Sequence, residues 1–368
     1  MSGPKLFQPF AIDKLSLANR IVIAPMCQYS AVDGCMTDWH LIHLGHLALS
    51  GAGLLIIEAT AVVPEGRITF GDVGLYDDES EAAMARVVER VRDHSDMPIA
   101  IQLSHAGRKA STDLPWRGGK QIAPDAENGW QTFAPSDLPF TATDHAPTGM
   151  DIAALDRVIA AFASATRRAA RLGLDAVQIH GAHGYLLHQF LSPLSNRRDD
   201  QYGGSVENRM RFPLAVFDAV RHAFPSDKPV TVRVSGTDWV EDGWAIEQTI
   251  AFARALEERG CSAIHVSSGG LDSRQEIAVG PGYQVPLARA VKQACSMPVV
   301  AVGLISEPEH AEAILTNGDA DLIALARAIL YDPRWPWHAA AELGAQVAAP
   351  NQYLRSQPRR FKELLRAR

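Results

Sequence analysis

The residues AVQIHGAHGYLLHQF, at positions 176–190, place three histidines and a tyrosine at the end of an apolar run. His180 ends the run, and His183, Tyr185 and His188 follow it. Two imidazoles can donate hydrogen bonds to a carbonyl or an anionic oxygen, and a phenol can donate a proton to a carbanion-like carbon. The pattern indicates acid–base chemistry, with His180 and His183 as donors to the substrate and Tyr185 as the proton donor.

Two other interpretations of these histidines stay open. A catalytic zinc usually takes a third protein ligand, and the chain has no HExxH motif and no Cys–His cluster. Glu58, on another predicted strand, is the only candidate for that ligand. The histidines can also be core residues with satisfied hydrogen bonds, but that does not explain why they follow the end of a strand. We expect His188 and Gln189 to be structural helix residues.

Eight short apolar runs, rich in β-branched residues, recur along the chain. Such runs without polar alternation are typical of parallel strands that are covered on both faces. They cover residues 21–26, 54–62, 98–105, 176–180, 230–235, 263–268, 297–303 and 321–328. Helical patterns alternate with them at residues 38–49, 80–94, 151–173, 206–223, 246–259, 284–295, 306–316 and 336–343. The alternation predicts a (β/α)8 barrel, in which Asp151 begins the clearest helix and Gly173 ends it.

We expect residues 1–368 to form a single domain with two additions. Residues 106–150 separate the third strand from its helix, and such a long connection in a compact domain is usually functional or disordered. Its prolines and aromatic residues favour an ordered cap over the barrel mouth. Residues 345–368 form a C-terminal tail.

Polar residues at the strand ends outline the predicted active site, because a barrel enzyme places its site at the carboxyl ends of its strands. Gly303 and Arg327 follow the seventh and eighth strands, where barrels commonly bind phosphate. They can instead be a turn glycine and an arginine that pairs with an acid. Arg233 and Gln102 suit a flat heteroaromatic group with carbonyls, such as a flavin, although an Arg233–Glu58 ion pair is the alternative.

Composition excludes several classes of protein. The net charge of −7, from 35 basic and 42 acidic residues, argues against a nucleic-acid surface. No apolar stretch is long enough for a membrane span, and the first residues lack a signal core. The four cysteines, without CxxC spacing, are typical of reduced thiols. We therefore expect a cytoplasmic protein with neither a membrane nor a nucleic-acid partner.

Five segments, in this order, resemble the Old Yellow Enzyme family of FMN-dependent ene-reductases. They are IVIAPMCQYS, EATAVVPEGRIT, IQLSHAGRKAS, HGAHGYLLHQFLSPLSNRRDDQYGGSVENRMRF and PGYQV. The cysteine of PMCQYS and the tail segment QYLRSQP are similar to the thermophilic-like subclass, often described as NADPH dehydrogenases. The chain departs from the pattern at Gly181 and Ala326, but Ala326 still offers a backbone N–H.

The resemblance implies a (β/α)8 barrel with FMN at its mouth and a specific set of residues around it. The implied flavin contacts are Ala24, Pro25, Met26, Cys27, Ala59, Gln102 and Arg233, and the implied phosphate contacts are Gly303, Ala326 and Arg327. Tyr29 would add a second hydroxyl over the flavin, and Cys27 would tune its potential. Arg355 would reach into the neighbouring subunit's site, although a solvated tail is the alternative.

The function implied by the resemblance is reduction of an activated alkene. NADPH, or NADH, would reduce FMN, which would pass hydride to an alkene conjugated to a carbonyl or nitro group. The substrate would contact Tyr29, His180, His183, Tyr185 and Arg355, in a homodimer or homotetramer that requires no metal. A metal-dependent hydrolase and a non-catalytic flavin- or phosphate-binding protein are the rival functions.

Overall fold

Eight parallel strands close into a barrel in the computed structural model, which describes residues 3–367. The strands are β3 (Ile21–Ile23), β4 (Leu54–Ala61), β5 (Ile99–Ser104), β8 (Ala176–Gly181), β9 (Val230–Ser235), β10 (Ala263–Ser267), β11 (Val299–Ala301) and β12 (Leu322–Leu325). Each strand pairs with the next, and β12 pairs with β3 to close the ring. The predicted (β/α)8 fold is confirmed, and all eight strands lie within one or two residues of the predicted runs or inside them.

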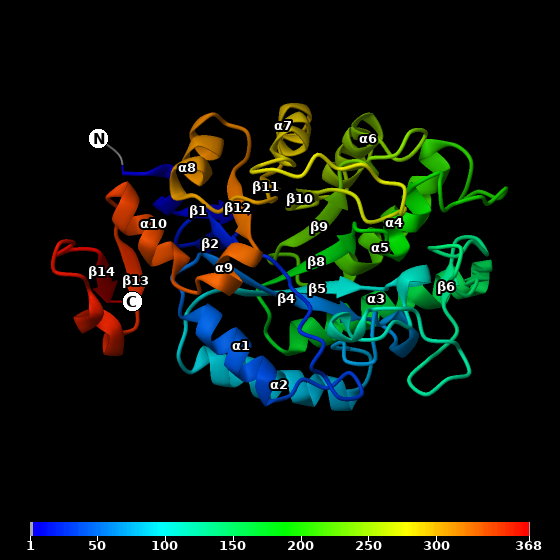
Figure 1. Cartoon of the computed structure of the whole chain (residues 1–368), viewed down its shortest axis with the longest axis horizontal. Coiled ribbons are helices and arrows are strands. Elements are labelled where there is room, and N and C mark those ends of the chain that lie inside the picture. Colours follow the sequence, from blue (N-terminus) through cyan, green and yellow to red (C-terminus); the bar gives the residue numbers. More distant parts are fainter. Residues whose placement is uncertain (1–2, 368) are drawn as a thin grey trace.

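The predicted helices surround the barrel (Figure 1). They are α1 (Asp38–Ala48), α2 (Asp78–Arg92), α3 (Ile152–Arg171), α5 (Val206–Ala223), α6 (Ile246–Glu257), α7 (Val285–Ala294), α8 (Pro308–Thr316) and α10 (Trp335–Leu343). Asp151 caps α3 by accepting a hydrogen bond from the Ala154 N–H at 2.7 Å, and Gly173 follows the helix with φ +71°. Within residues 3–367, no helix is both long and apolar enough to cross a membrane.

The barrel interior changes from apolar to polar along the strands. Near the amino ends, inward-facing side chains such as Leu54, Ala100 and Ala263 form one apolar cluster. Alternate residues, such as Ile101 and Val266, face outward and pack in the main core with the helices. Two residues further along the same inward faces, polar side chains replace the apolar ones: Gln102, Gln178, Arg233 and His265. The polar pocket therefore begins halfway along the barrel.

A β-hairpin that the sequence analysis missed closes the amino end of the barrel. It consists of β1 (Phe10–Ile12) and β2 (Leu15–Leu17), which pair in antiparallel fashion. Ile12 and Leu17 belong to the apolar cluster inside the barrel, and Leu17 is only 1% exposed. This plug removes the amino end from solvent, so the interior opens only at the carboxyl ends of the strands.

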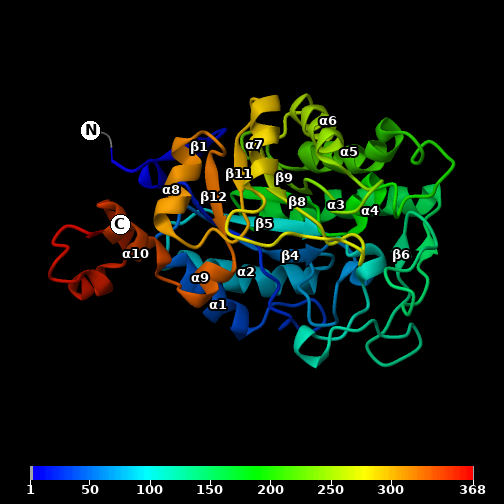
Figure 2. The same ribbon diagram turned by 45° about the horizontal axis from the view of Figure 1, so that its top comes forward.

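The segment 106–150 is built of short elements that line the barrel mouth. They are η3 (Gly107–Lys109), η4 (Pro115–Arg117), β6 (Phe133–Ala134) and β7 (Thr148–Gly149). The tail contains β13 (Val347–Ala349), η5 (Asn351–Ser356) and β14 (Leu365–Ala367). Figures 1 and 2 show the tail and the β6 region at opposite ends of the molecule. Residues 1, 2 and 368 of the predicted domain lie outside the described residues.

The short helices α4 (Leu186–Leu191) and α9 (Arg327–Tyr331) were not among the eight predicted helices, although His188 and Gln189 of α4 were expected to be helical. Each follows a barrel strand directly, β8 and β12 respectively. Six or five residues are too few to show a helical period, so the apolar pattern could not reveal them. Both matter to the site, because α4 begins just after Tyr185 and α9 begins at Arg327.

The barrel plug generates a prediction about stability. Leu17→Ala removes buried methyl groups from a closed apolar cluster and should lower the free energy of unfolding by about 2–5 kcal/mol. The control Val279→Ala alters a side chain that is 64% exposed and should have little effect. Urea denaturation of both variants measures the difference. Equal stability of the two variants would show that the hairpin does not pack as a plug.

Candidate active site

The predicted donor residues converge at the end of β8. The rings of His180 and His183 lie 5.1 Å apart between centroids at an interplanar angle of 88°. The ring of Tyr185 lies 4.9 Å from that of His180, at 85°. Burial, and then the charge of Arg233, hold the pKa of both imidazoles well below the usual value. Both histidines are therefore uncharged at neutral pH, and each ring has one N–H to donate.

The two histidines have different hydrogen-bond partners. The His180 Nδ1 atom accepts from the Ala182 N–H at 3.3 Å, which leaves the proton on Nε2. The His183 Nε2 atom lies 2.7 Å from the Ser267 Oγ atom, and Ser267 in turn donates to Gln284. Ser267 therefore accepts from the His183 ring, whereas the His180 Nε2–H has no hydrogen-bond acceptor among the described residues.

A buried carboxylate holds the loop that carries these rings. The Nδ1 atom of His188, on α4, accepts from the Gly184 N–H at 2.9 Å, and its Nε2 atom lies 2.8 Å from Asp238 Oδ1. Asp238 is fully buried and also accepts from Ser192 Oγ and Trp244 N. The expectation that His188 is a structural helix residue agrees with this contact, which fixes the backbone between His183 and Tyr185.

Arg233 is a buried cation with an unsatisfied donor inside the barrel. It is 8% exposed, and its Nε atom has no partner among the described residues. Burial lowers its pKa to about 10, so it stays charged at neutral pH. The alternative Arg233–Glu58 ion pair does not form, since Glu58 instead contacts His40 at 3.5 Å and accepts from the Gln28 N–H. The Nε2 atom of Gln102 donates to Gln178 at 2.8 Å.

Arg233 also lines a cavity of about 400 Å³ between the ends of β10, β11 and β12. The other walls include the predicted phosphate contacts Gly303, Ala326 and Arg327. Gly303 has φ +126°, and an added Cβ would lie 2.8 Å from Gln284 Nε2, so only glycine fits. Arg327 is exposed and pairs with no acid among residues 3–367, which removes the acid-partner alternative.

The segment after β3 forms the next wall of the site. Ala24 joins β12 through its N–H and the Leu325 carbonyl, at 2.9 Å. Pro25, Met26 and Cys27 follow it, and Glu58 holds the Gln28 N–H at 2.8 Å. Burial raises the pKa of the Cys27 thiol well above its usual value, so the thiol stays protonated. Ala59 lies buried on β4, directly after the bulge at Glu58.

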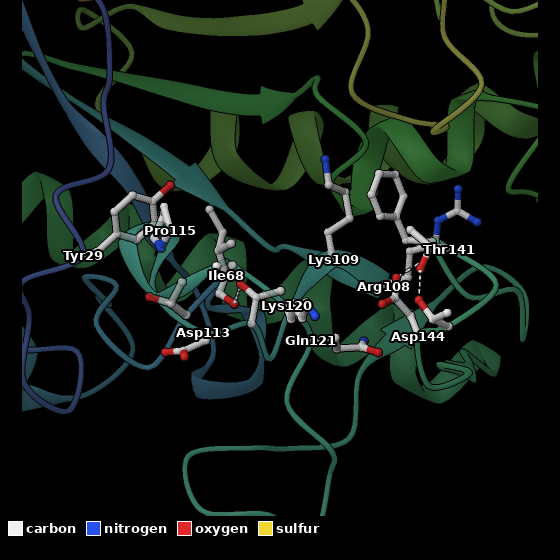
Figure 3. A pocket seen from close by; sticks show the side chains of 16 residues that line it. Tyr29, Ile68, Arg108, Lys109, Asp113, Pro115, Lys120, Gln121, Thr141 and Asp144 are labelled. Carbon is white, nitrogen blue, oxygen red and sulfur yellow. Dashed lines mark hydrogen bonds between the residues drawn. The ribbon is translucent and has the colours of Figure 1, made fainter.

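A second cavity, of about 750 Å³, lies outside this wall (Figure 3). Tyr29 lines one side, and its ring packs edge-on against Trp116 of the segment 106–150 at 6.0 Å. Arg108, Lys109 and Phe140, from the same segment, line the other side. The segment therefore covers the barrel mouth, and it encloses a space wide enough for a multi-ring molecule.

The model of the NADH:flavin oxidoreductase / NADH oxidase family matches residues 5–346. An NADPH dehydrogenase of Geobacillus sp. (strain WCH70) is 43% identical over 352 residues, which cover 95% of this chain and 98% of the relative. The chain belongs to this family. It is therefore an oxidoreductase, and the resemblance to the Old Yellow Enzyme family is confirmed. An NADH:flavin oxidoreductase of Gibberella zeae is 42% identical and is covered over 88% of its length.

Solved structures agree with this assignment. Morphinone reductase is 29% identical, with a TM-score of 0.77 and coverage of 94% of this chain and 91% of that protein. A 2-naphthoyl-CoA reductase has a TM-score of 0.83 at 22% identity, and this chain spans 52% of its length. The latter likeness concerns the fold alone, whereas the former also supports the family.

The interior of the barrel fits a flavin. Arg233 offers an unsatisfied N–H, and the Ser104 hydroxyl and both His265 ring nitrogens are also buried without partners among the described residues. Gly303 leaves its backbone open to close approach, next to the exposed guanidinium of Arg327. A polar, planar group with a phosphate satisfies such a set of donors. We conclude that the residues present suit the flavin expected in this family.

One of the predicted site residues lies far from the others, and the structure shows further residues at the site that the sequence did not predict. Arg355 is exposed on η5, in the tail at the far end from the β6 region (Figures 1 and 2). Glu58 and His40 were not predicted as a pair, although Glu58 interrupts an apolar strand. Lys109 was also missed, although it follows Arg108 directly after the third strand. Among residues 3–367, no three His, Cys, Asp or Glu side chains group as metal ligands.

Glu58 generates a prediction about pH. Burial raises the pKa of its carboxyl from 4.5 to about 8. The protonated form of Glu58 favours the folded state. This contribution to stability is fully present below the pKa that Glu58 has in the unfolded chain, and it is lost as pH rises through about 8. Glu58→Gln keeps an oxygen acceptor and cannot ionise, so its melting temperature should match wild type near pH 5 and exceed it by roughly a few degrees near pH 9. The control is Glu89→Gln on the exposed face of α2. Parallel pH profiles for wild type and Glu58→Gln would refute the raised pKa.

Proposed function

We propose that the enzyme uses FMN and NADPH to reduce the carbon–carbon double bond of α,β-unsaturated carbonyl or nitro compounds. The observation that carries the proposal is the convergence of two uncharged imidazoles and a phenol at the end of β8. The names of the relatives, NADPH dehydrogenase and morphinone reductase, support it. When bound, FMN would accept hydride from the nicotinamide and deliver it to the β-carbon of the alkene.

The proposed cofactor contacts follow the two inner walls of the site. Arg233 would donate to the pyrimidine edge and stabilise negative charge there, because its guanidinium is buried and its Nε atom has no partner among the described residues. Arg327, with the backbone at Gly303 and Ala326, would hold the phosphate. Gln102 and Ala59 would lie on the pyrimidine side. Ala24, Pro25, Met26 and Cys27 would pack along the ring system.

The imidazoles would polarise the substrate. The His180 Nε2–H has no acceptor among the described residues, so it is ready to donate to the carbonyl or nitro oxygen. That oxygen would compete with Ser267 for the His183 N–H. As negative charge develops on the oxygen, these hydrogen bonds strengthen.

Tyr185 would deliver the proton to the α-carbon. Burial and the neighbouring Cys27 and Tyr29 raise its pKa well above 10, so the hydroxyl stays protonated throughout the physiological range. Its ring packs edge-on against His180 and thus lies beside the bound oxygen. Tyr29, whose pKa is raised well above its usual value by burial, would supply a second hydroxyl at the outer wall.

The assembly is a further part of the proposal. We infer a homodimer or homotetramer in which Arg355 enters a neighbouring subunit's substrate cavity. The tail and the segment 106–150 lie at opposite ends of the molecule, so Arg355 does not line the cavity of its own chain (Figure 2). The proposal also includes a cytoplasmic location and no nucleic-acid partner.

The purified protein tests the proposed function against its rivals. We expect a yellow protein that oxidises NADPH when cyclohexenone is added, and that retains this activity after exhaustive chelation. A colourless protein that requires zinc would favour the hydrolase. A yellow protein that transfers no hydride to any activated alkene would favour a binding role.

Arg327→Ala tests the phosphate site. Loss of the exposed guanidinium removes the main charge from the proposed phosphate contacts and should yield largely colourless protein at micromolar FMN. Arg86→Ala, which removes an exposed arginine on α2, is the control. The flavin-to-protein ratio of each variant is measured from visible absorbance. Full flavin occupancy in Arg327→Ala would reject this phosphate site.

Tyr185→Phe tests the proton donor. A general acid contributes about 10²–10⁴ in rate, so the half-reaction with cyclohexenone should slow by that order, while the NADPH half-reaction stays nearly unchanged. The rate with nitroalkenes should fall less, because the nitronate anion formed by hydride transfer is stable enough to take its proton from solvent. Stopped-flow measurement separates the two steps, and Tyr331→Phe, at a side chain 94% exposed, is the control. A wild-type rate with cyclohexenone would assign the proton to Tyr29 or solvent.

Arg355→Ala tests the contribution from a neighbouring subunit. The variant should keep its fold and flavin but show lower kcat/KM across several enones, because a cation at the substrate cavity is lost. Arg359→Ala, in the same exposed tail, is the control. Sedimentation checks that both variants keep the oligomer of the wild type. Unchanged kinetics in Arg355→Ala would favour the alternative, in which Arg355 is part of a solvated tail.

A further inference from the structure

Lys109 joins three segments of the barrel mouth through one ammonium group. It ends η3, at the start of the segment 106–150. Its Nζ atom donates to the carbonyl of His183 at 2.9 Å, after β8, and to the carbonyl of Gly270 at 2.8 Å, after β10. The side chain extends away from Lys120 and Gln121 on the cavity wall (Figure 3). A single cation therefore holds together the segment 106–150, the loop after β8 that carries His183 and Tyr185, and the loop after β10 that carries Gly270.

The two loops leave little freedom around this contact. His183, Gly184 and Gly270 all have positive φ, at +58°, +73° and +87°. A Cβ on Gly184 would lie 2.1 Å from the Gly270 carbonyl oxygen, so the two backbones touch without room for a side chain. Their carbonyl groups converge on Lys109, and two partial negative charges that converge away from water need a donor. Lys109 supplies the donors for both.

The same ammonium lies beside the ring of Tyr185. Its Nζ atom is 5.2 Å from the centroid of Tyr185 and 4.7 Å from that of Phe140. A cation at that distance attracts the face of a phenol ring, and it attracts a phenolate more strongly. Proton donation turns Tyr185 into a phenolate in a buried place, which is costly without a nearby positive charge.

We propose that Lys109 is a positioning residue for proton transfer: its ammonium fixes the loop that carries His183 and Tyr185, and it stabilises the phenolate that Tyr185 becomes. The proposal rests on the proposed function, since it assigns Lys109 a role in the step with the alkene. It assigns no role in the NADPH step.

The charge of Lys109 is sensitive to pH. Burial, and then the charge of Arg108, lower its pKa from 10.5 to about 8. The groups that face it or share its cavity are Arg108, His180, His183, Tyr185, Tyr29, Asp113, Lys120 and Asp144. The imidazoles have pKa values well below 6.5 and the two phenols have pKa values well above 10, so neither kind of ring changes charge near pH 8. The positive charge, and its attraction for the ring of Tyr185, should be lost as pH rises through about 8.

Two substitutions at Lys109 and one elsewhere test the proposal. Lys109→Met keeps the length of the side chain without its charge, and Lys109→Arg keeps the charge at all accessible pH values. Lys228→Met is the matched control. Lys228 also donates to two backbone carbonyls, of Gly173 and Leu174, and lies 6.0 Å from the Phe224 ring, but it is remote from the cavity.

The first measurement is the pH dependence of the half-reaction with cyclohexenone. We expect the wild-type and Lys228→Met rates to fall above about pH 8 and the fall to move to higher pH in Lys109→Arg. Lys109→Met should be slower by about tenfold or more below pH 8 and should lack that fall. The NADPH half-reaction should be unaffected. Because Glu58 has a pKa near the same value, the profile is repeated in Glu58→Gln, which should keep the fall.

The second measurement is hydrogen–deuterium exchange, which does not depend on turnover. Peptides that cover residues 181–191 and 267–272 should exchange faster in Lys109→Met than in Lys109→Arg or Lys228→Met. Wild-type rates and exchange in Lys109→Met, or an equal loss of both half-reactions, would overturn the positioning role. If the fall in rate disappears in Glu58→Gln, the group that titrates near pH 8 is Glu58, and the positioning role of Lys109 is overturned too. A wild-type enzyme that reduces no enone would reject the proposed function itself, and this role with it.

Discussion

Hydrogen bonds between the first and last barrel strands determine where every site residue lies. The Ile323 N–H donates to the Arg20 carbonyl, and the Ala24 N–H donates to the Leu325 carbonyl, both at 2.9 Å. These bonds join segments 300 residues apart in sequence. They bring the wall that carries Cys27 and Tyr29 against the strands that carry Gly303 and Arg327. Without closure the two proposed halves of the flavin site would belong to opposite edges of an open sheet.

Burial at the barrel mouth then sets the charge of each group. The site keeps His180 and His183 neutral and Cys27 and Tyr185 protonated, and Arg233 remains charged. Each direction has the same cause, since low polarity disfavours the charged form of any group that lacks a partner. The site therefore holds a neutral donor set beside a buried cation. That combination suits a reaction in which negative charge appears on the substrate and is then removed by a proton.

The loop between β8 and α4, which carries His183 and Tyr185, owes its shape to contacts on two sides. From the helix side, His188 and Asp238 hold the Gly184 N–H. From the cap side, Lys109 holds the His183 carbonyl. His183 has a positive φ of +58°, a conformation that non-glycine residues seldom adopt without such support. Loops normally move more than strands, but this one is anchored by side chains that are themselves buried or partly buried.

The sequence by itself determined the eight strands, the order of the helices and most of the residues at the mouth. A covered parallel strand must be apolar on both faces, so Arg233, Gln102 and His180 stood out against their neighbours. The pattern also placed Gly303 and Arg327 at neighbouring strand ends. The hairpin β1–β2 escaped because its strands are three residues long, although Phe10, Ile12, Leu15 and Leu17 alternate as a half-buried strand pair requires.

Only the tertiary structure decided which polar atoms already have hydrogen-bond partners within the protein. No sequence pattern shows that Ser267 accepts from His183, that Glu58 holds the backbone after Cys27, or that Lys109 reaches across two loops. These contacts join residues between 30 and 161 positions apart, and each requires two atoms to lie 2.7–2.9 Å from one another. Residue type and spacing determine which strand end a side chain follows. Hydrogen-bond partners and burial depend on how the closed barrel packs its loops, and that is where the chemistry of each group is set.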